Sequence, residues 1–260
     1  MIQVYRHSDV LSTRVPSFST VYFVAVIFFA TLIRSTFGFG EALIAVPLLA
    51  LVMPVAIAAP VAVLVSVVVA AAIVVEDWRR VDFRSAAGLL ATALVGIPVG
   101  VLLLAHAPER LVKGGLGLVI VAFSIYSLAT RSGARAPHDH PAWLIGCGFL
   151  SGVLGGAYGM NGPPLVVYGA LRQWPPQKFR ATLQAYFLPA SLVGVIGYAA
   201  IGLWTPTITR FFLWSLPAVA AGIVLGRTIH RRMSADVFLR LVHAALVLIG
   251  VTLVVQALKQ

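Results

Sequence analysis

The chain has 260 residues, of which 60% are hydrophobic, and its mean hydropathy is +0.98. Soluble globular domains are typically about 45–50% apolar, so this class is excluded. The net charge of +11 could point to nucleic acid. However, the basic residues lie in short loops between apolar runs, where the positive-inside bias of membrane proteins expects them. We therefore predict a polytopic helical membrane protein that is embedded in the lipid bilayer and does not bind nucleic acid.

The apolar runs divide the chain into two similar halves. A polar lead over residues 1–18 precedes the first membrane repeat at 19–130, a polar linker covers 131–140, and the second repeat covers 141–260. We read the first apolar run as a membrane segment and not as a cleaved signal peptide. The first repeat is predicted to have helices over 19–36, 41–52, 55–76, 85–105 and 110–130. The second is predicted to have helices over 142–157, 163–171, 179–201, 209–229 and 236–258.

One stretch of the second half cannot form an unbroken helix. Residues 141–171 carry no charged side chain and should lie at membrane depth, yet they include Gly159, Gly162 and the Pro163-Pro164 pair. Glycine loosens the backbone, and proline lacks an N–H donor and clashes with the preceding turn. Non-helical backbone within a bilayer is tolerated only where it is buried in protein or lines a wet cavity. The sequence therefore predicts a break at 158–161 and a half-helix that opens at Pro163 or Pro164.

The first half contains a matching break at Phe37–Gly40. Residues 37–47 align with 158–168 at an offset of 158 − 37 = 121, which pairs Gly38 with Gly159. Further along, Gly96 pairs with Gly222 and Gly100 with Gly226, at an offset of 222 − 96 = 126. These later glycines are best explained by close packing of helices. The ordered set of pairs indicates two copies of one unit.

Charge decides between inverted and parallel copies. If the two helices beside each break form a re-entrant pair or two short crossings, each copy crosses the membrane an odd number of times and the copies are inverted. If they form one broken crossing, the copies are parallel. The inverted case collects most basic residues on one side, which the positive-inside rule makes cytoplasmic. We therefore predict an all-α membrane protein of two inverted repeats, each with a broken or re-entrant helix pair plus three spanning helices. The collected residues are Arg79, Arg80, Arg84, Arg131, Arg135, Arg172, Lys178, Arg180, Arg227, Arg231 and Arg232.

Two half-helix starts that meet near the midplane are typical of secondary transporters. Each helix N-terminus carries about half a positive charge and unpaired N–H donors, so two such ends can hold an anion. Side chains near the breaks and at the mouth of 179–201 could add contacts, since arginine matches oxyanions bidentately. The predicted substrate-binding residues are Arg34, Gly38, Gly40, Glu41, Tyr158, Asn161, Gly162, Pro163, Arg180 and Gln184.

Glu41 is the one carboxylate within a long apolar run. An ionisable group at membrane depth is a functional candidate, and burial would favour a proton on it, so Glu41 is the candidate for proton coupling. An acid in the first turn of a helix can also serve as a cap for N–H groups. Its counterpart in the second half is Gly162, and both interpretations stay open.

Other functions have weaker support. His138-Asp139-His140 lies in the polar linker and is better explained as solvated loop than as a metal site. No nucleotide-binding loop, dinucleotide fingerprint or catalytic motif occurs, so we expect no cofactor and no enzyme activity. A channel, a permease for cations or other anions, or a non-catalytic membrane subunit is the alternative, and a homo-oligomer is left open.

Two motifs together resemble a known family. The stretches Gly38-Phe39-Gly40-Glu41-Ala42-Leu43-Ile44-Ala45-Val46-Pro47 and Gly159-Met160-Asn161-Gly162-Pro163-Pro164, with the later Phe179-Arg180-Ala181-Thr182, are similar to the paired signature of the TauE/SafE sulfite exporter family. The resemblance spans nearly the whole chain. It implies a bacterial inner-membrane transporter, usually an exporter, for sulfite, thiosulfate or organosulfonates.

Overall fold

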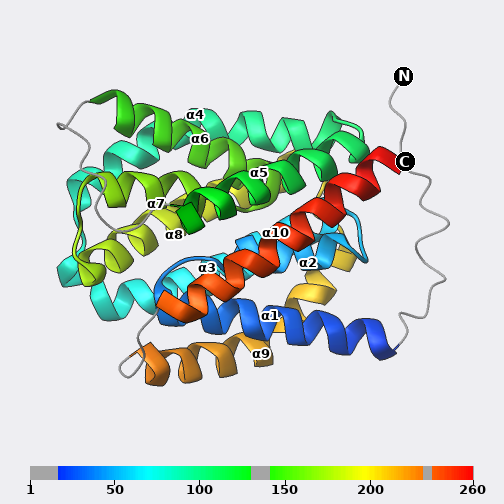
Figure 1. Ribbon diagram of the computed structural model, residues 1–260, viewed down its shortest axis with the longest axis horizontal. Helices are drawn as coiled ribbons and strands as arrows, with labels where there is room; N and C mark the ends of the chain where they lie inside the picture. The colour runs from blue at the N-terminus through cyan, green and yellow to red at the C-terminus, as the bar shows by residue number, and fades with distance from the viewer. Residues whose placement is uncertain (1–16, 130–140, 231–235, 260) are drawn as a thin grey trace.

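The computed structural model describes residues 17–129, 141–230 and 236–259, and the regular elements in these ranges are all helices (Figure 1). The predicted linker, with His138-Asp139-His140, and most of the polar lead lie outside the described residues. So do Arg131, Arg135, Arg231 and Arg232. The first half forms α1 (Ser17–Phe37), α2 (Glu41–Ala50), α3 (Val55–Asp77), η1 (Trp78–Arg80), α4 (Phe83–His106) and α5 (Glu109–Ala129). The second half forms α6 (Pro141–Tyr158), α7 (Gly162–Leu171), α8 (Pro176–Ala200), α9 (Pro206–His230) and α10 (Asp236–Lys259).

Within the described residues, seven helices are long and apolar enough to span a bilayer, so the chain is a multi-pass membrane protein. Helices α2 and α7 are apolar but only 10 residues long, as expected of half-helices. Every predicted helix is present. The largest errors are at the starts of α8 and α9, which begin at Pro176 and Pro206, three residues earlier than predicted. Proline favours the first helical position because its fixed φ suits the helix and its missing N–H would be unpaired there.

Helices of one half pack against helices of the other. Helix α1 packs on α9 and α4 packs on α6, while α3 contacts α8 and α5 contacts α10. Figure 1 shows α10 beside α5 and α1 beside α9. In the predicted alignment α1 corresponds to α6, α4 to α9, α3 to α8 and α5 to α10. The contacts between the two halves therefore follow an approximate two-fold pattern.

The glycine pairs make these contacts close. A methyl group added at Gly96 would meet the carbonyl oxygen of Phe149 on α6, and one at Gly100 would meet the α6 backbone one turn further on. In the other pair of helices, a methyl group at Gly222 would lie 3.0 Å from Cβ of Thr31 on α1. The packing role predicted for these glycines is confirmed.

Ion pairs join four helix ends at one end of the bundle. They connect the end of α3 and the start of α4 with the start of α8 and the end of α9. Helices α3 and α8 therefore run in opposite directions, and so do α4 and α9. Inverted repeats would have this relation, but the inverted arrangement of the copies and their orientation in a bilayer stay predictions. The pairs are Arg227–Glu76 at 2.7 Å, Lys178–Asp82 at 2.8 Å and Arg180–Asp77 at 3.6 Å.

Asp82 has three roles at this end. Its carboxylate caps α4 by accepting from the Ser85 backbone N–H at 3.1 Å, it pairs with Lys178, and its own N–H donates to the Thr182 hydroxyl at 3.0 Å. Burial alone would raise the pKa of Asp82, but the hydrogen bond from Lys178 and those from Ser85 outweigh it, so this pKa lies below its ordinary value. The ionised form is therefore the one that the fold stabilises.

We expect Gly96→Ala to lower the free energy of unfolding by about 1–3 kcal/mol, because the added methyl group forces α4 and α6 apart. Gly146→Ala is the matched control, since nothing lies within 4 Å of a methyl group at this exposed position on α6. There, the better helix propensity of alanine should leave the melting temperature unchanged or higher. Thermal unfolding in detergent measures both, and equal effects would contradict close packing at Gly96.

Lowering the pH should weaken the end of the bundle that Asp82 closes. Because its folded-state pKa is lowered, ionised Asp82 stabilises the fold above its unfolded-state pKa, and this contribution is lost as the pH falls through the folded-state value. Melting temperatures would be compared between about pH 6 and about pH 3, a range around the ordinary Asp pKa of about 3.9. Asp82→Asn keeps a capping side chain but cannot titrate, so it should lose less stability than the wild type over this range. An equal loss in both proteins would contradict this role of Asp82.

Candidate functional site

The first break depends on two glycines in the left-handed region. Gly38 has φ of +88° and Gly40 has φ of +99°, a conformation that strains any residue with a side chain. Space is also short, because a methyl group at Gly38 would lie 2.8 Å from Cγ of Arg180. The chain leaves α1 at Phe37 and starts α2 at Glu41 after this turn.

The second break is tied to α8 by hydrogen bonds. Gly159 has φ of +68°, and α7 begins at Gly162 with prolines in its first turn. The Ser151 hydroxyl donates to the carbonyl oxygen of Asn161 at 2.7 Å and lies 2.9 Å from the hydroxyl of Tyr186, which is fully buried on α8. The break is therefore held in one position and is not a loose loop.

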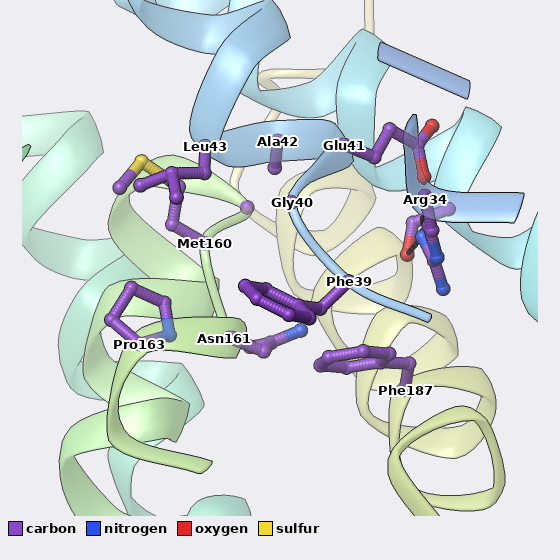
Figure 2. Close-up of a pocket in the computed structure, with 13 residues that line it drawn as sticks. Arg34, Phe39, Gly40, Glu41, Ala42, Leu43, Met160, Asn161, Pro163 and Phe187 are labelled. Carbon is purple, nitrogen blue, oxygen red and sulfur yellow. Dashed lines mark hydrogen bonds and ion pairs between the residues drawn. The ribbon is translucent and has the colours of Figure 1, made fainter. Parts of the chain in front are cut away.

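Both breaks open onto one pocket of about 30 Å³ (Figure 2). Figure 2 shows Arg34 and Glu41 together on one side, Met160 and Pro163 on the other, and Phe39 and Asn161 between them. The predicted residues Gly40, Glu41, Asn161, Gly162 and Pro163 thus come together, with Arg34 beside them. The full lining is Arg34, Phe39, Gly40, Glu41, Ala42, Leu43, Ser66, Gly159, Met160, Asn161, Gly162, Pro163 and Phe187.

Equivalent positions of the two halves form most of this lining. Five pairs of lining residues are 121 residues apart, which is the offset between the two breaks, as in 187 − 66 = 121. The scaffold is symmetric, but the chemistry is not, because charge and hydroxyl groups lie in the first half. The pairs are Phe39 with Met160, Gly40 with Asn161, Glu41 with Gly162, Ala42 with Pro163, and Ser66 with Phe187.

A buried ion pair is the polar centre of the pocket. Arg34 is 3% exposed and Glu41 is 2% exposed. One terminal nitrogen of Arg34, Nη1, donates to Glu41 Oε2 and, at 2.6 Å, to the hydroxyl of Ser66. The other, Nη2, donates to Oε1 of Gln184 at 2.8 Å. Side chains from α2, α3 and α8 therefore converge on one guanidinium group.

Side chains of helix α8 contact Arg34, Ser66 and the first break. The amide nitrogen of Gln184 donates to the carbonyl oxygen of Gly38 at 2.6 Å, so one side chain contacts both Arg34 and the first break. The ring of Phe187 lies 5.0 Å from the Arg34 guanidinium carbon, within the range of a cation–π contact. The Ser191 hydroxyl donates to that of Ser66 at 3.1 Å.

The N-termini of the two half-helices offer different numbers of N–H donors. Neither α2 nor α7 has a side-chain cap at its N-terminus. The first turn of α2 offers the N–H groups of Glu41, Ala42 and Leu43. In α7, Pro163 and the next residue, also proline, have no N–H, so the first turn offers mainly that of Gly162. An anion here would be held chiefly by α2 and Arg34, with α7 adding its dipole.

Some atoms in this pocket lack partners within the described part of the chain. Oε1 of Glu41 and Nε of Arg34 are buried without a hydrogen bond, and so is Oδ1 of Asn161, which faces Gly155 on α6. The side-chain amide of Asn161 points toward the rings of Phe39 and Phe187 in Figure 2. Buried polar groups are usually paired, so such atoms indicate a place where a ligand or water completes the network. No group of three or more metal-binding side chains occurs among the described residues.

Four predicted residues lie outside the lining. Gly38 and Gln184 stand directly behind Arg34, as described above. Tyr158 turns away, because its hydroxyl faces α5, where a methyl group at Gly115 would lie 2.7 Å from it. Arg180 is 7% exposed but pairs with Asp77 at the bundle end, with its Cγ against Gly38. Tyr158 and Arg180 therefore do not reach the pocket in this conformation.

Sequence reasoning missed Ser66 and Phe187. Ser66 is the only hydroxyl-bearing residue of α3, which is otherwise apolar until its last two residues, so a lone polar group in a membrane helix was an available signal. Phe187 lies 121 residues after Ser66, which matches the starts of α3 at Val55 and α8 at Pro176, but the sequence alignment did not pair these two residues. Two of the three hydrogen-bond partners of Arg34, Ser66 and Gln184, lie 32 and 150 residues away in the chain, and no local pattern identifies them.

Gln184→Leu should destabilise the protein by about 1–3 kcal/mol, because it leaves Arg34 Nη2 and the Gly38 carbonyl oxygen without their partner. Gln177→Leu, at an exposed position in the first turn of the same helix, is the control and should have little effect. Chemical or thermal unfolding in detergent gives both values. If the two variants were equally stable, the hydrogen bonds of Gln184 would contribute nothing to the fold.

Comparison with known proteins places the chain in a family. The family model described as "Sulfite exporter TauE/SafE" matches residues 23–253. A "Probable membrane transporter protein y4hK" of Sinorhizobium fredii is 30% identical over 184 residues, covering 66% of this chain and 69% of the relative. A "Probable sulfite/organosulfonate exporter TauE" of Cupriavidus necator is 26% identical over 183 residues, covering 70% of each. No solved structure matches the chain. The chain belongs to the sulfite exporter TauE/SafE family of membrane transporters.

Proposed function

We propose that the protein is a secondary transporter that moves small sulfur-containing oxyanions, such as sulfite, thiosulfate or organosulfonates, across the bacterial inner membrane by alternating access. The observation that carries the proposal is the buried Arg34 guanidinium beside the N-terminus of α2, in a pocket between two helix breaks. The substrate class is taken from the family and from the relative of Cupriavidus necator, whose name includes sulfite and organosulfonate.

The pocket offers an oxyanion several types of donor. The planar guanidinium group of Arg34 can bind two oxygens at once, and the N–H groups of Glu41, Ala42 and Leu43 are free at the start of α2. The amide of Asn161 adds a neutral donor from the opposite break. One positively charged side chain is enough to bind the anion here, because electrostatic attraction is stronger in a site that excludes water. An organosulfonate would place its sulfonate group in this pocket.

The breaks and the bundle end provide the parts of an alternating-access cycle. We place the end with Arg79, Arg80, Arg84, Lys178 and Arg227 in the cytoplasm, by the positive-inside rule. The ion pairs from α3 and α4 to α8 and α9 close this end. Opening it would require α8 and α9 to move relative to α3 and α4, and the same α8 contacts both breaks. In this arrangement, access to the pocket and the geometry of the breaks change together.

A cation channel or permease is less well supported by the same geometry. Glu41 is the carboxylate in the pocket, but its Oε2 is occupied by Arg34. A cation bound there would lie next to a guanidinium group in a medium of low dielectric constant, where like charges repel strongly.

Asn161→Ala should weaken anion binding about 10- to 100-fold, because a hydrogen bond to a charged group contributes about 1.5–3 kcal/mol. Counterflow of sulfite, thiosulfate and a small organosulfonate in proteoliposomes measures the effect. The unfolding free energy should change much less, since Oδ1 of this side chain has no hydrogen-bond partner among the described residues. Thr228→Ala, an exposed position on α9, is the control for reconstitution.

Two results would contradict these statements. If Asn161→Ala lowers stability and leaves the affinity of the folded fraction unchanged, the residue is structural. If the wild type carries none of the three anions, the proposed function itself is wrong.

A further inference from the structure

The Glu41 carboxylate stands where the proposed substrate would bind. It is the first residue of α2, it lines the pocket, and its Oε2 accepts from Arg34 Nη1. A carboxylate is itself an oxyanion, so Glu41 pairs with the guanidinium group that an external anion would use, at the same end of α2. Its second oxygen, Oε1, has no hydrogen bond within the described residues.

The charge of the buried pocket limits what can enter. Arg34 and Glu41 together are neutral, and an isolated charge buried without a partner is strongly destabilising. If a monovalent anion entered beside the ionised Glu41, the pocket would carry one net negative charge. If Glu41 took up a proton at the same time, the pocket would stay neutral, with the new anion as the partner of Arg34.

We propose that Glu41 acts as an internal anion that the substrate displaces from Arg34, so that one proton enters the pocket with each monovalent anion. This inference rests on the proposed function. The proton binds to the carboxylate of Glu41, whose Oε1 has no partner, and Arg34 keeps all its own protons. When the anion leaves, Glu41 releases the proton to the same side and pairs with Arg34 again. Proton and anion therefore move in the same direction, without net charge transfer.

The same balance predicts selectivity by charge. Hydrogensulfite and sulfonates are monovalent, and with one proton they leave the pocket neutral. A divalent anion such as thiosulfate would leave it with one negative charge, even with Glu41 protonated. The site should therefore prefer monovalent sulfur oxyanions to divalent ones of similar size.

Among the described residues, Arg34 is the charged side chain that contacts the Glu41 carboxylate. Helix α2 packs on α1, α3, α5 and α10. Of these helices, α1 contributes Arg34 and α3 contributes the neutral Ser66, which shares Nη1 of Arg34 with Glu41. The other charged residues with described side chains lie in the first two turns of α5 or near the ends of α3 and α10: Glu109, Arg110, Lys113, Glu76, Asp77 and Lys259.

Glu41→Gln, which mimics the protonated acid, tests the proposal in proteoliposomes with methanesulfonate as the probe. In the wild type, we expect the apparent Kd to rise about tenfold per pH unit above the protonation range, and an imposed proton gradient to drive methanesulfonate uptake. In Glu41→Gln, we expect exchange to continue with less than about twofold pH dependence, and the proton gradient to drive no accumulation. Glu109→Gln, which removes a carboxylate in the first turn of α5, away from the pocket lining and from the ion pairs of the bundle end, is the matched control and should behave as the wild type does toward pH.

Proton uptake by the wild type provides a test that does not depend on the variant folding. Calorimetric titration with methanesulfonate, in buffers of different ionisation enthalpy, should show one proton taken up per anion bound. Competition with thiosulfate should show weaker binding of the divalent anion at the same pH.

The outcomes distinguish failure of the internal-anion proposal from failure of the proposed transport function. Transport of methanesulfonate without proton uptake, or a Glu41→Gln variant that still couples flux to the proton gradient, would overturn the internal-anion proposal and leave the proposed function standing. A wild type that binds thiosulfate more tightly than methanesulfonate would also overturn it. Failure of the wild type to move methanesulfonate, sulfite or thiosulfate would overturn the proposed function, and this inference with it.

Discussion

The ion pair between Arg34 and Glu41 is the constraint on which the centre of the structure depends. Removing two charges from water costs several kcal/mol per ion, and the attraction between them offsets this only when further hydrogen bonds complete the arrangement. Ser66 from α3 and Gln184 from α8 complete it here. The two ions are seven residues apart, which in a continuous helix means a separation of about 10 Å along the axis. The chain must therefore turn between them, and Gly38 and Gly40 make that turn possible.

Helix α8 connects this ion pair to the second break. Gln184 contacts Arg34 and the Gly38 carbonyl, Tyr186 meets Ser151 under the second break, and Phe187 lies between the two in the pocket lining. These three residues occupy a single turn of the helix. Because the contacts are hydrogen bonds among buried groups, a displacement of α8 would leave several polar groups unpaired unless both breaks moved with it. Such linkage is what a transporter needs if one movement is to close one entrance and open the other.

Local chemistry explains what the sequence could predict. Clustered glycine and proline residues interrupt a helix at membrane depth, so both breaks, both half-helices and every helix were predictable, with errors of at most three residues at the ends. The partners of Arg34 were not, because Ser66 and Gln184 meet it only after distant helices have packed. Tyr158 illustrates the same limit: its position beside the break is local, but the direction of its ring depends on space at Gly115 of α5. The small number of N–H donors at the start of α7, by contrast, could have been predicted from its two consecutive prolines.

The symmetric scaffold carries asymmetric chemistry, and this bears on the direction of transport. In the second half, the positions equivalent to Arg34 and Glu41 are Gly155 and Gly162, and Phe187 replaces Ser66. If the two halves exchange conformations during transport, the charges stay with α1 and α2 throughout. The pocket therefore presents the same guanidinium group and carboxylate to both sides of the membrane, and the scaffold itself sets no preferred direction. The gradients must set it. If proton and anion move together as proposed, an inward proton gradient favours uptake, and export requires an anion gradient large enough to exceed it.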